Sequence, residues 1–148
     1  LAAGTVLSTF PSTGRTSSTS PLKRQIPTSG EWLPAVGMGT WITFNVGRNT
    51  TLRDQRALVL KKFFDMGGGM IDSSPMYGSA EDVLGYCFNK LATTKGLFSA
   101  TKVWTPSDDE GHEQVANSKR LWGLNTFDLF QVHNLVNWEN VAERLSNA

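Results

Sequence analysis

The sequence predicts an α/β fold, namely the N-terminal half of a (β/α)8 TIM barrel preceded by a β-hairpin. Strand-like and helix-like segments alternate strictly from residue 35 onward with short connections, which is typical of a parallel sheet with helical crossovers. Gly37 and Gly39 lie inside the first strand, not in a turn directly before a helix, which disfavours the alternative of an open dinucleotide-binding sheet. Four strand–helix units make half of a barrel, which usually needs about 250 residues.

The composition excludes several classes of protein. The 148 residues suffice for one domain with a core. The 14 Lys and Arg residues nearly balance the 13 Asp and Glu residues, so nothing indicates the basic face of a nucleic-acid-binding protein. No apolar run approaches the ~20 residues that span a bilayer. Cys87 is the single cysteine, which excludes an intramolecular disulfide, and we expect no metal site.

Residues 1–22 differ from the remainder of the chain. Ten of the first twenty residues are Ser or Thr, so we expect this segment to be a disordered leader and residues 23–148 to form the partial barrel. The first seven residues are similar to the end of an export signal, although an ordinary flexible tail explains them equally well. Localisation therefore stays open between the cytoplasm and export to the periplasm. Because the chain starts at Leu1, we expect the native N-terminus to be longer.

Two extended runs, residues 23–26 and 31–33, flank a turn that contains Pro27 and Gly30, which predicts a β-hairpin. Residues 35–41 are apolar on both alternating faces. This pattern predicts a strand that is covered on both sides, as in a parallel sheet.

The next segments predict a helix, a strand and a second helix. Thr51 and Asp54 form a capping-box pattern, and a helix should run from there to the glycines at 67–69. Residues 70–72 predict a short strand. A second capping box at 79–82 opens a helix that should end near Gly96. The apolar positions of the two helices are Leu52, Leu58, Val59, Phe63 and Met66 in the first, and Val83, Leu84, Cys87, Phe88 and Leu91 in the second.

Two further units complete the pattern. Residues 97–104 predict a strand, and a helix near 113–122 should end at Gly123, with the polar run around His112 as a solvated loop before it. Residues 127–133 predict the fourth strand, and residues 138–146 begin a last helix.

Four reactive side chains stand where the predicted strands end, and they are Asp72, Tyr77, Lys102 and His133. Barrel enzymes build their active sites at the carboxyl ends of the strands, so these side chains should converge. Each of them alone has an ordinary structural explanation, such as a turn or a snorkelling lysine. Together they favour catalysis, because charges gathered at one rim are costly unless they are paired and used.

The sequence resembles the aldo-keto reductase family in four motifs: Gly-Met-Gly-Thr-Trp at 37–41, Asp-Ser-Ser-Pro-Met-Tyr-Gly at 72–78, Thr-Lys-Val-Trp at 101–104 and Asp-Leu-Phe-Gln-Val-His-Asn at 128–134. The resemblance runs from about Arg24 to the C-terminus. It implies that Tyr77 is the proton donor, tuned by Lys102 and Asp72, and that His133 orients and polarises the carbonyl. It also implies that the hairpin covers the N-terminal end of the barrel.

The resemblance further implies a nicotinamide cofactor. Residues that should approach its ribose are Gly39, Thr40, Trp41 and Asp72, and Trp104 should line the substrate pocket. Close packing of strands explains Gly39 equally well. NADPH is the expected cofactor, with NADH not excluded, and the expected substrate is a small carbonyl compound.

The predicted function is therefore NAD(P)H-dependent reduction of an aldehyde or ketone to an alcohol. Hydride transfer leaves negative charge on the carbonyl oxygen, which a positioned acid must neutralise. A free phenol is a weak acid with a pKa of about 10, and a nearby ammonium lowers this value. The alternative is a non-catalytic, reductase-like subunit that binds cofactor or regulates. We expect this chain to be an incomplete fragment that is inactive alone, and the sequence leaves its substrate and oligomeric state open.

Overall fold

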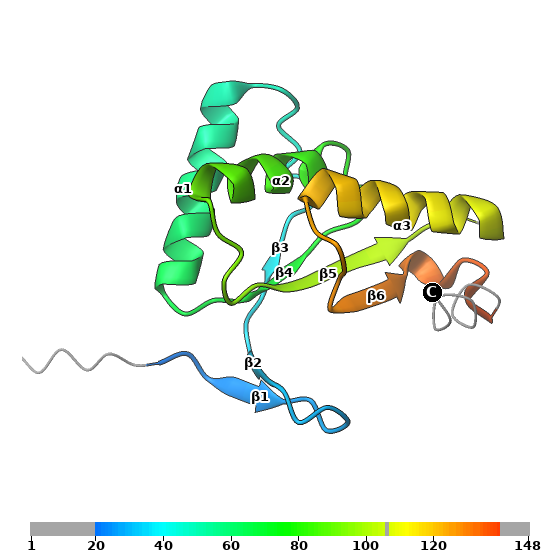
Figure 1. Cartoon of the computed structure of the whole chain (residues 1–148), viewed down its shortest axis with the longest axis horizontal. Coiled ribbons are helices and arrows are strands. Elements are labelled where there is room, and N and C mark those ends of the chain that lie inside the picture. Colours follow the sequence, from blue (N-terminus) through cyan, green and yellow to red (C-terminus); the bar gives the residue numbers. More distant parts are fainter. Residues whose placement is uncertain (1–19, 106, 140–148) are drawn as a thin grey trace, which may run out of the picture.

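The computed structural model describes residues 20–105 and 107–139 (Figure 1). In chain order the elements are β1 (Lys23–Gln25), β2 (Trp32–Pro34), β3 (Met38–Gly39), α1 (Thr50–Asp65), β4 (Met70–Asp72), α2 (Ala80–Leu91), β5 (Phe98–Val103), α3 (Asp108–Trp122), β6 (Leu129–Val132) and the short 3-10 helix η1 (His133–Leu135). The expected leader and the expected helix at 138–146 fall almost entirely outside the described residues.

The central sheet is parallel, and its four strands lie side by side in sequence order, β3-β4-β5-β6. Figure 1 shows the connecting helices α1, α2 and α3 on the same side of this sheet. A doubly wound sheet would carry helices on both faces, whereas a barrel carries them on one. The arrangement is that of a partial (β/α)8 barrel, as the sequence predicts, with three strand–helix units and the strand of a fourth among the described residues.

The predicted hairpin is confirmed. Strands β1 and β2 pair antiparallel with Arg24 opposite Leu33, and Gly30 adopts a φ of 74° in the turn between them. The hairpin and the segments leading into β4 and β5 line a common hollow of about 500 Å³. The hairpin therefore lies at the amino ends of these strands, opposite the end at which Asp72 stands.

Strand β3 is shorter than expected. Only Met38 and Gly39 pair with β4, and the predicted burial of residues 35–41 on both sides is wrong, because Val36 is 76 % and Trp41 64 % exposed. Trp41 already belongs to the turn that follows the strand. Its ring is exposed because the chain leaves the sheet at this point.

Helix α1 begins two residues earlier than the Thr51 cap predicts. Asn49 is the N-cap, and its Oδ1 accepts a hydrogen bond of 3.0 Å from the amide of Leu52. The predicted apolar face is wrong as well, because Leu58 is exposed whereas Ala57 and Leu60 are buried. These two buried residues share one side of the helix at the three-residue spacing, and α1 packs there against α2.

The N-terminus of α2 is tied to a distant loop. Ser79 precedes the helix, as predicted, but its hydroxyl makes no capping hydrogen bond. It accepts a bond of 2.8 Å from the amide of Gly47 and donates one of 3.0 Å to Asn45 Oδ1. The helix ends at Ala92, which has a left-handed backbone, and so stops before Gly96. The hydrophobic core around α2 is formed by Phe44, Ala57, Leu60, Ile71, Ala80, Val83, Leu84, Cys87, Phe88, Trp122 and Phe127.

Helix α3 begins earlier than predicted, so the polar run expected as a loop is helical from Asp108 onward. Glu110, in the first turn, accepts a hydrogen bond of 2.5 Å from the hydroxyl of Thr105, and a carboxylate there also suits the positive end of the helix dipole. The helix ends at Gly123, as predicted, with a φ of 70°.

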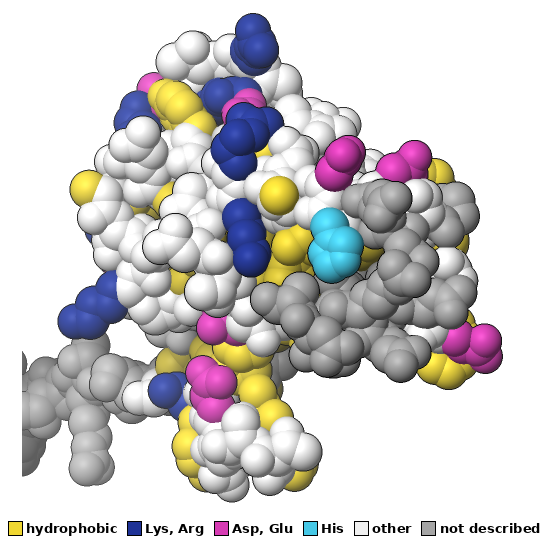
Figure 2. All heavy atoms as spheres, turned by 45° about the vertical axis from the view of Figure 1, so that its right-hand side comes forward, with side chains coloured by type: hydrophobic (Ala, Val, Ile, Leu, Met, Phe, Trp, Pro, Cys, Tyr) yellow, Lys and Arg dark blue, Asp and Glu magenta, His cyan; other side chains and the backbone are white. Residues whose placement is uncertain are grey.

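The outer surface of the fold is mixed in charge. On the face shown in Figure 2, basic and acidic side chains are interspersed, and yellow hydrophobic side chains gather at the lower end, where the hairpin lies. Within the described part of the chain, every helix is too short or too polar to cross a bilayer.

Candidate active site

The carboxyl ends of β4 and β5 bring Asp72 and Lys102 together. Asp72 is the last residue of β4 and Lys102 the last but one of β5. Lys102 Nζ lies 2.6 Å from each Asp72 carboxylate oxygen and donates a further hydrogen bond of 2.8 Å to the carbonyl of Ser73. An ammonium has three hydrogen atoms, so these contacts use all of its donors.

Tyr77 lies beside this ion pair, in the loop that follows β4. The Lys102 ammonium is 5.3 Å from the centre of the Tyr77 ring, and no hydrogen bond joins it to the phenol among the described residues. The positive charge can therefore act on the phenol through space. A cation at this distance from an aromatic ring interacts with it favourably, by about 0.5–2 kcal/mol.

His133 completes the group at the end of β6. Its ring and the Tyr77 ring form a T-shaped pair with centroids 5.8 Å apart and an interplanar angle of 84°. Burial lowers the pKa of His133, and the charge of Lys102 lowers it further, against a smaller opposing effect of Asp72. The imidazole is consequently neutral at physiological pH.

A hollow of about 300 Å³ opens at this point, lined by Trp41, Met76, Tyr77 and His133. Two of the four reactive side chains form its wall, and the Asp72–Lys102 pair lies directly behind Tyr77. The four residues that the sequence selected therefore lie close together beside one hollow.

Of the other residues selected from the sequence, Gly39, Trp41 and Trp104 are exposed and Thr40 is buried. Gly39 is exposed, with nothing within 4 Å of where a Cβ would stand, and Trp41 lines the hollow. Thr40 is fully buried, and its hydroxyl lies within hydrogen-bond distance of Ser73 Oγ (2.8 Å) and of the Asp72 carbonyl (3.0 Å). Trp104 is partly exposed after β5 and is absent from the lining of this hollow.

Sequence reasoning missed two polar residues near the site. Ser74 is buried, and its Oγ lies 2.8 Å from His133 Nδ1. Gln114 on α3 holds the backbone of Trp104 through two hydrogen bonds, one to its carbonyl (2.7 Å) and one from its amide (2.9 Å). The available signal for Ser74 was a polar residue within two positions of the end of the strand that carries Asp72, whereas no sequence signal points to Gln114.

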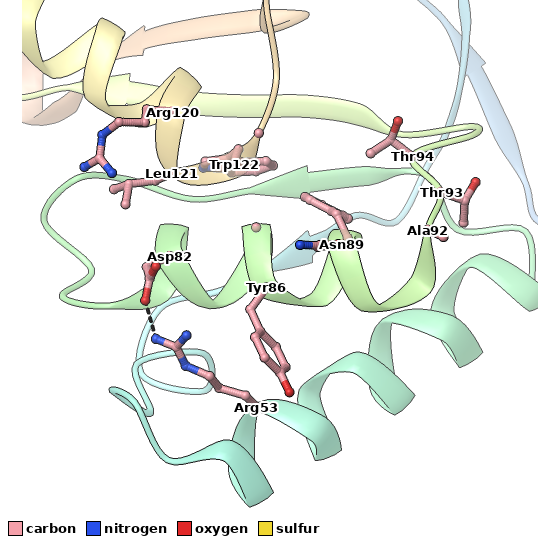
Figure 3. Close-up of a pocket in the computed structure, with 13 residues that line it drawn as sticks. Arg53, Asp82, Tyr86, Asn89, Ala92, Thr93, Thr94, Arg120, Leu121 and Trp122 are labelled. Atoms are coloured by element: carbon pink, nitrogen blue, oxygen red, sulfur yellow. Dashed lines mark hydrogen bonds and ion pairs between the residues drawn. The ribbon is translucent and has the colours of Figure 1, made fainter.

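A larger hollow, of about 660 Å³, lies among the helices and shares no lining residue with the first (Figure 3). Arg53 of α1 and Asp82 of α2 point toward one another there and form an ion pair. Arg120 donates a hydrogen bond of 2.6 Å to Asn117 of its own helix. These charges are engaged in structural contacts, so the hollow beside Tyr77 is the candidate active site.

Comparison with known proteins yields relatives of one kind. The chain is 29 % identical over 103 residues to methylglyoxal reductase YeaE of Escherichia coli (strain K12), a match that covers 68 % of this chain and 35 % of that protein. A probable NAD(P)H-dependent D-xylose reductase of Neosartorya fischeri is 29 % identical over 107 residues, covering 71 % and 32 %. The chain thus spans about a third of the length of these curated relatives.

Solved structures agree in fold. An aldo/keto reductase from Klebsiella pneumoniae in complex with NADP and acetate superposes with a TM-score of 0.60 at 25 % identity, over 70 % of this chain and 36 % of that one. A thermostable aldo-keto reductase solved with the inhibitor epalrestat has a TM-score of 0.68 at 22 % identity, over 85 % of this chain and 50 % of that one.

The sequence profile described as "Aldo/keto reductase family" matches residues 35–146. This match contains all four strands of the parallel sheet and all four residues of the candidate active site. The chain therefore belongs to the aldo/keto reductase family.

Proposed function

We propose that this chain supplies the catalytic half of an NAD(P)H-dependent enzyme that reduces an aldehyde or a ketone to an alcohol. The observation that carries the proposal is the arrangement of Tyr77 between the Asp72–Lys102 ion pair and the ring of His133. A developing alkoxide can be protonated in such a hollow. The surrounding groups are a phenol, an ammonium with its counter-ion and a neutral imidazole.

The described residues fit one edge of a nicotinamide nucleotide. Gly39 presents exposed backbone with open space at its Cβ position, directly opposite Asp72 in the sheet. Trp41 and Tyr77, with ring centroids 6.5 Å apart, offer flat surfaces at the adjoining hollow. When bound, the nicotinamide supplies the hydride, which no side chain can provide. We expect NADPH as the cofactor and do not exclude NADH.

In the proposed mechanism, Tyr77 donates the proton. Its phenol loses a proton to the oxygen of the substrate as negative charge develops there. The Lys102 ammonium stabilises the resulting phenolate through space, because its hydrogen atoms are already engaged by Asp72 and Ser73. Asp72 holds this ammonium in place and compensates its charge before the reaction.

His133 has a different task in this mechanism. As a neutral imidazole it can donate one hydrogen bond to the carbonyl oxygen, which fixes the carbonyl beside Tyr77 and polarises it. Trp41 and Met76 complete the wall of the hollow. The substrate class is accordingly a small carbonyl compound with an apolar or aromatic face.

The test is the substitution Tyr77→Phe in the full-length protein. It keeps the ring and removes the proton donor, so turnover of an activated aldehyde with NADPH should fall by about 10²–10⁴-fold. Affinity for NADPH, measured by fluorescence titration, should change little. Tyr86→Phe is the matched control, because Tyr86 is the second tyrosine and donates its hydroxyl to Asp54 on α1, away from the hollow.

Retention of most of the turnover by the Tyr77→Phe protein would show that the tyrosine is structural. A wild-type protein that binds NADPH but reduces no carbonyl compound would instead favour the non-catalytic, regulatory subunit.

A further inference from the structure

The loop between β4 and Tyr77 places a serine hydroxyl against the imidazole of His133. Ser74 is 1 % exposed, and its Oγ lies 2.8 Å from His133 Nδ1. We propose that Ser74 is a positioning residue that holds His133 in the tautomer with its hydrogen on Nε2, so that Nε2 is the donor offered to the substrate. The tautomer follows from the hydrogen bonds of Ser74 to a neutral ring, and only its use in catalysis rests on the proposed function.

The hydrogen bonds of Ser74 determine the direction of this contact. Its Oγ carries one hydrogen and can accept two. The backbone amide of Met76 donates to it over 3.3 Å. If His133 Nδ1 also donated to it, the hydroxyl hydrogen would be left without an acceptor among the described residues. An unsatisfied donor is costly in so buried a position.

The opposite direction satisfies both the hydroxyl of Ser74 and Nδ1 of His133. When Nδ1 carries no hydrogen, the Ser74 hydroxyl donates to it while still accepting from Met76. The remaining ring nitrogen, Nε2, then carries the hydrogen. No described residue accepts a hydrogen bond from Nε2, and the ring forms part of the wall of the hollow. This donor is therefore available to a ligand.

The surroundings of the His133 ring explain why its tautomer decides which nitrogen can donate a hydrogen bond. The titratable groups that face His133 are Lys102 from β5, Asp72 from β4 and Tyr77 from the loop. Burial and the charge of Lys102 keep the imidazole neutral. A neutral imidazole has only one N–H, so the partner of Nδ1 decides whether Nε2 can donate at all.

Nuclear magnetic resonance tests the tautomer without any assay of activity. The sequence contains two histidines, and His112 lies exposed on α3 and serves as the internal reference. In wild-type protein labelled with ¹⁵N-histidine, we expect His133 Nδ1 to resonate as a bare nitrogen and Nε2 as an N–H. The reverse pattern in the wild type would overturn the proposal, whatever any variant does.

The substitution Ser74→Ala gives a second test, in which the direction of the change in the pKa of His133 distinguishes the two hydrogen-bond directions. A hydrogen bond donated to bare Nδ1 stabilises the neutral ring, so its loss should raise the pKa of His133 and mix the two tautomers. If Ser74 instead accepted from Nδ1, the pKa would fall. Ser73→Ala is the matched control, because this neighbouring serine is equally buried and its hydroxyl contacts Thr40. It should leave the tautomer of His133 unchanged.

Steady-state kinetics tests whether the tautomer of His133 affects the rate of the proposed reaction. Partners that orient metal-binding histidines contribute about 10–100-fold, and by analogy we expect kcat/KM of Ser74→Ala for an aldehyde to fall in that range. NADPH affinity should stay constant. If the tautomer is as expected but Tyr77→Phe retains its turnover, the proposed function fails and the assignment of the tautomer stands. If Tyr77→Phe loses its turnover and Ser74→Ala changes neither tautomer nor kcat/KM, the role of Ser74 is disproved.

Discussion

The side chain of Lys102 is more deeply buried than that of Asp72, with which it pairs: the two are 11 % and 30 % exposed. Water can therefore solvate the carboxylate better than the ammonium if the pair is broken. Two charges that meet in this way stabilise the fold less than their attraction suggests, since both give up hydration.

This asymmetry predicts unequal effects of the two single substitutions. Asp72→Asn leaves the buried ammonium without an anion and should lower the free energy of unfolding by about 2 kcal/mol, whereas Lys102→Met should lower it by about 1 kcal/mol. The double variant should lose less than the sum of the two losses, because it leaves no unpaired charge. Urea unfolding at neutral pH measures all three. Strictly additive losses would contradict the coupling.

A second prediction concerns Glu81, a carboxylate that is only 2 % exposed. Its oxygens accept hydrogen bonds from Thr101 (2.7 Å), Ser118 (2.9 Å) and the indole of Trp122 (3.0 Å), and no cation pairs with it among the described residues. In Glu81→Gln, the side-chain carbonyl oxygen can still accept from Thr101 and Trp122. The new amide group can donate to the hydroxyl oxygen of Ser118. It should cost about 1 kcal/mol, whereas Glu81→Ala leaves three donors unsatisfied and should cost more than about 3 kcal/mol. Urea unfolding compares the two, and equal losses would show that the charge matters instead of the acceptors.

A third prediction uses two helical glycines with opposite surroundings. A Cβ on Gly85 of α2 would lie 1.9 Å from the carbonyl oxygen of Leu121, so the two helices pack there backbone to backbone. Gly85→Ala should therefore destabilise the protein by about 1–3 kcal/mol. On Gly111 of α3, a Cβ would meet Val103 at an ordinary 3.6 Å, and Gly111→Ala should stabilise by about 0.5–1 kcal/mol through helix propensity. Thermal unfolding of the pair should show shifts of opposite sign.

A fourth prediction concerns alkaline pH. Burial raises the pKa of the Cys87 thiol from 9.0 to about 11, and Sγ contacts the carbonyl oxygen of Arg53 at 3.7 Å. The unfolded chain releases this proton first, so stability should be unaffected below about pH 9 and should fall as pH rises toward about 11, by about 2–3 kcal/mol. The Cys87→Ala variant, followed through the same pH series by urea unfolding, should lack this part of the decline. Parallel curves for the two proteins would contradict the assignment.

Much of the fold follows from local patterns in the sequence. The hairpin around Pro27 and Gly30, strand β4 and the helix stop at Gly123 depend on residues close together in the chain. The convergence of Asp72 with Lys102 was predictable too, because parallel strands end at the same edge of a sheet.

The remaining features depend on contacts between distant segments. Asn49 and Thr51 are both good capping residues, and the helix that follows starts from Asn49, where Arg53 also reaches back to the carbonyl of Gly47. The contact of Ser74 with His133 joins the loop after β4 to the start of η1, and nothing in the local sequence relates these two segments. Such choices are made by tertiary packing, which a pattern in a single segment does not contain.

The order of the strands in the parallel sheet has a consequence for biosynthesis. Each strand pairs with the strand that precedes it in the sequence, and only one helix with its loops separates them. Closing so short a loop costs little entropy, and contacts of this kind form rapidly. As the chain leaves the ribosome, every new unit therefore finds its template already in place, and the sheet can grow strand by strand during translation.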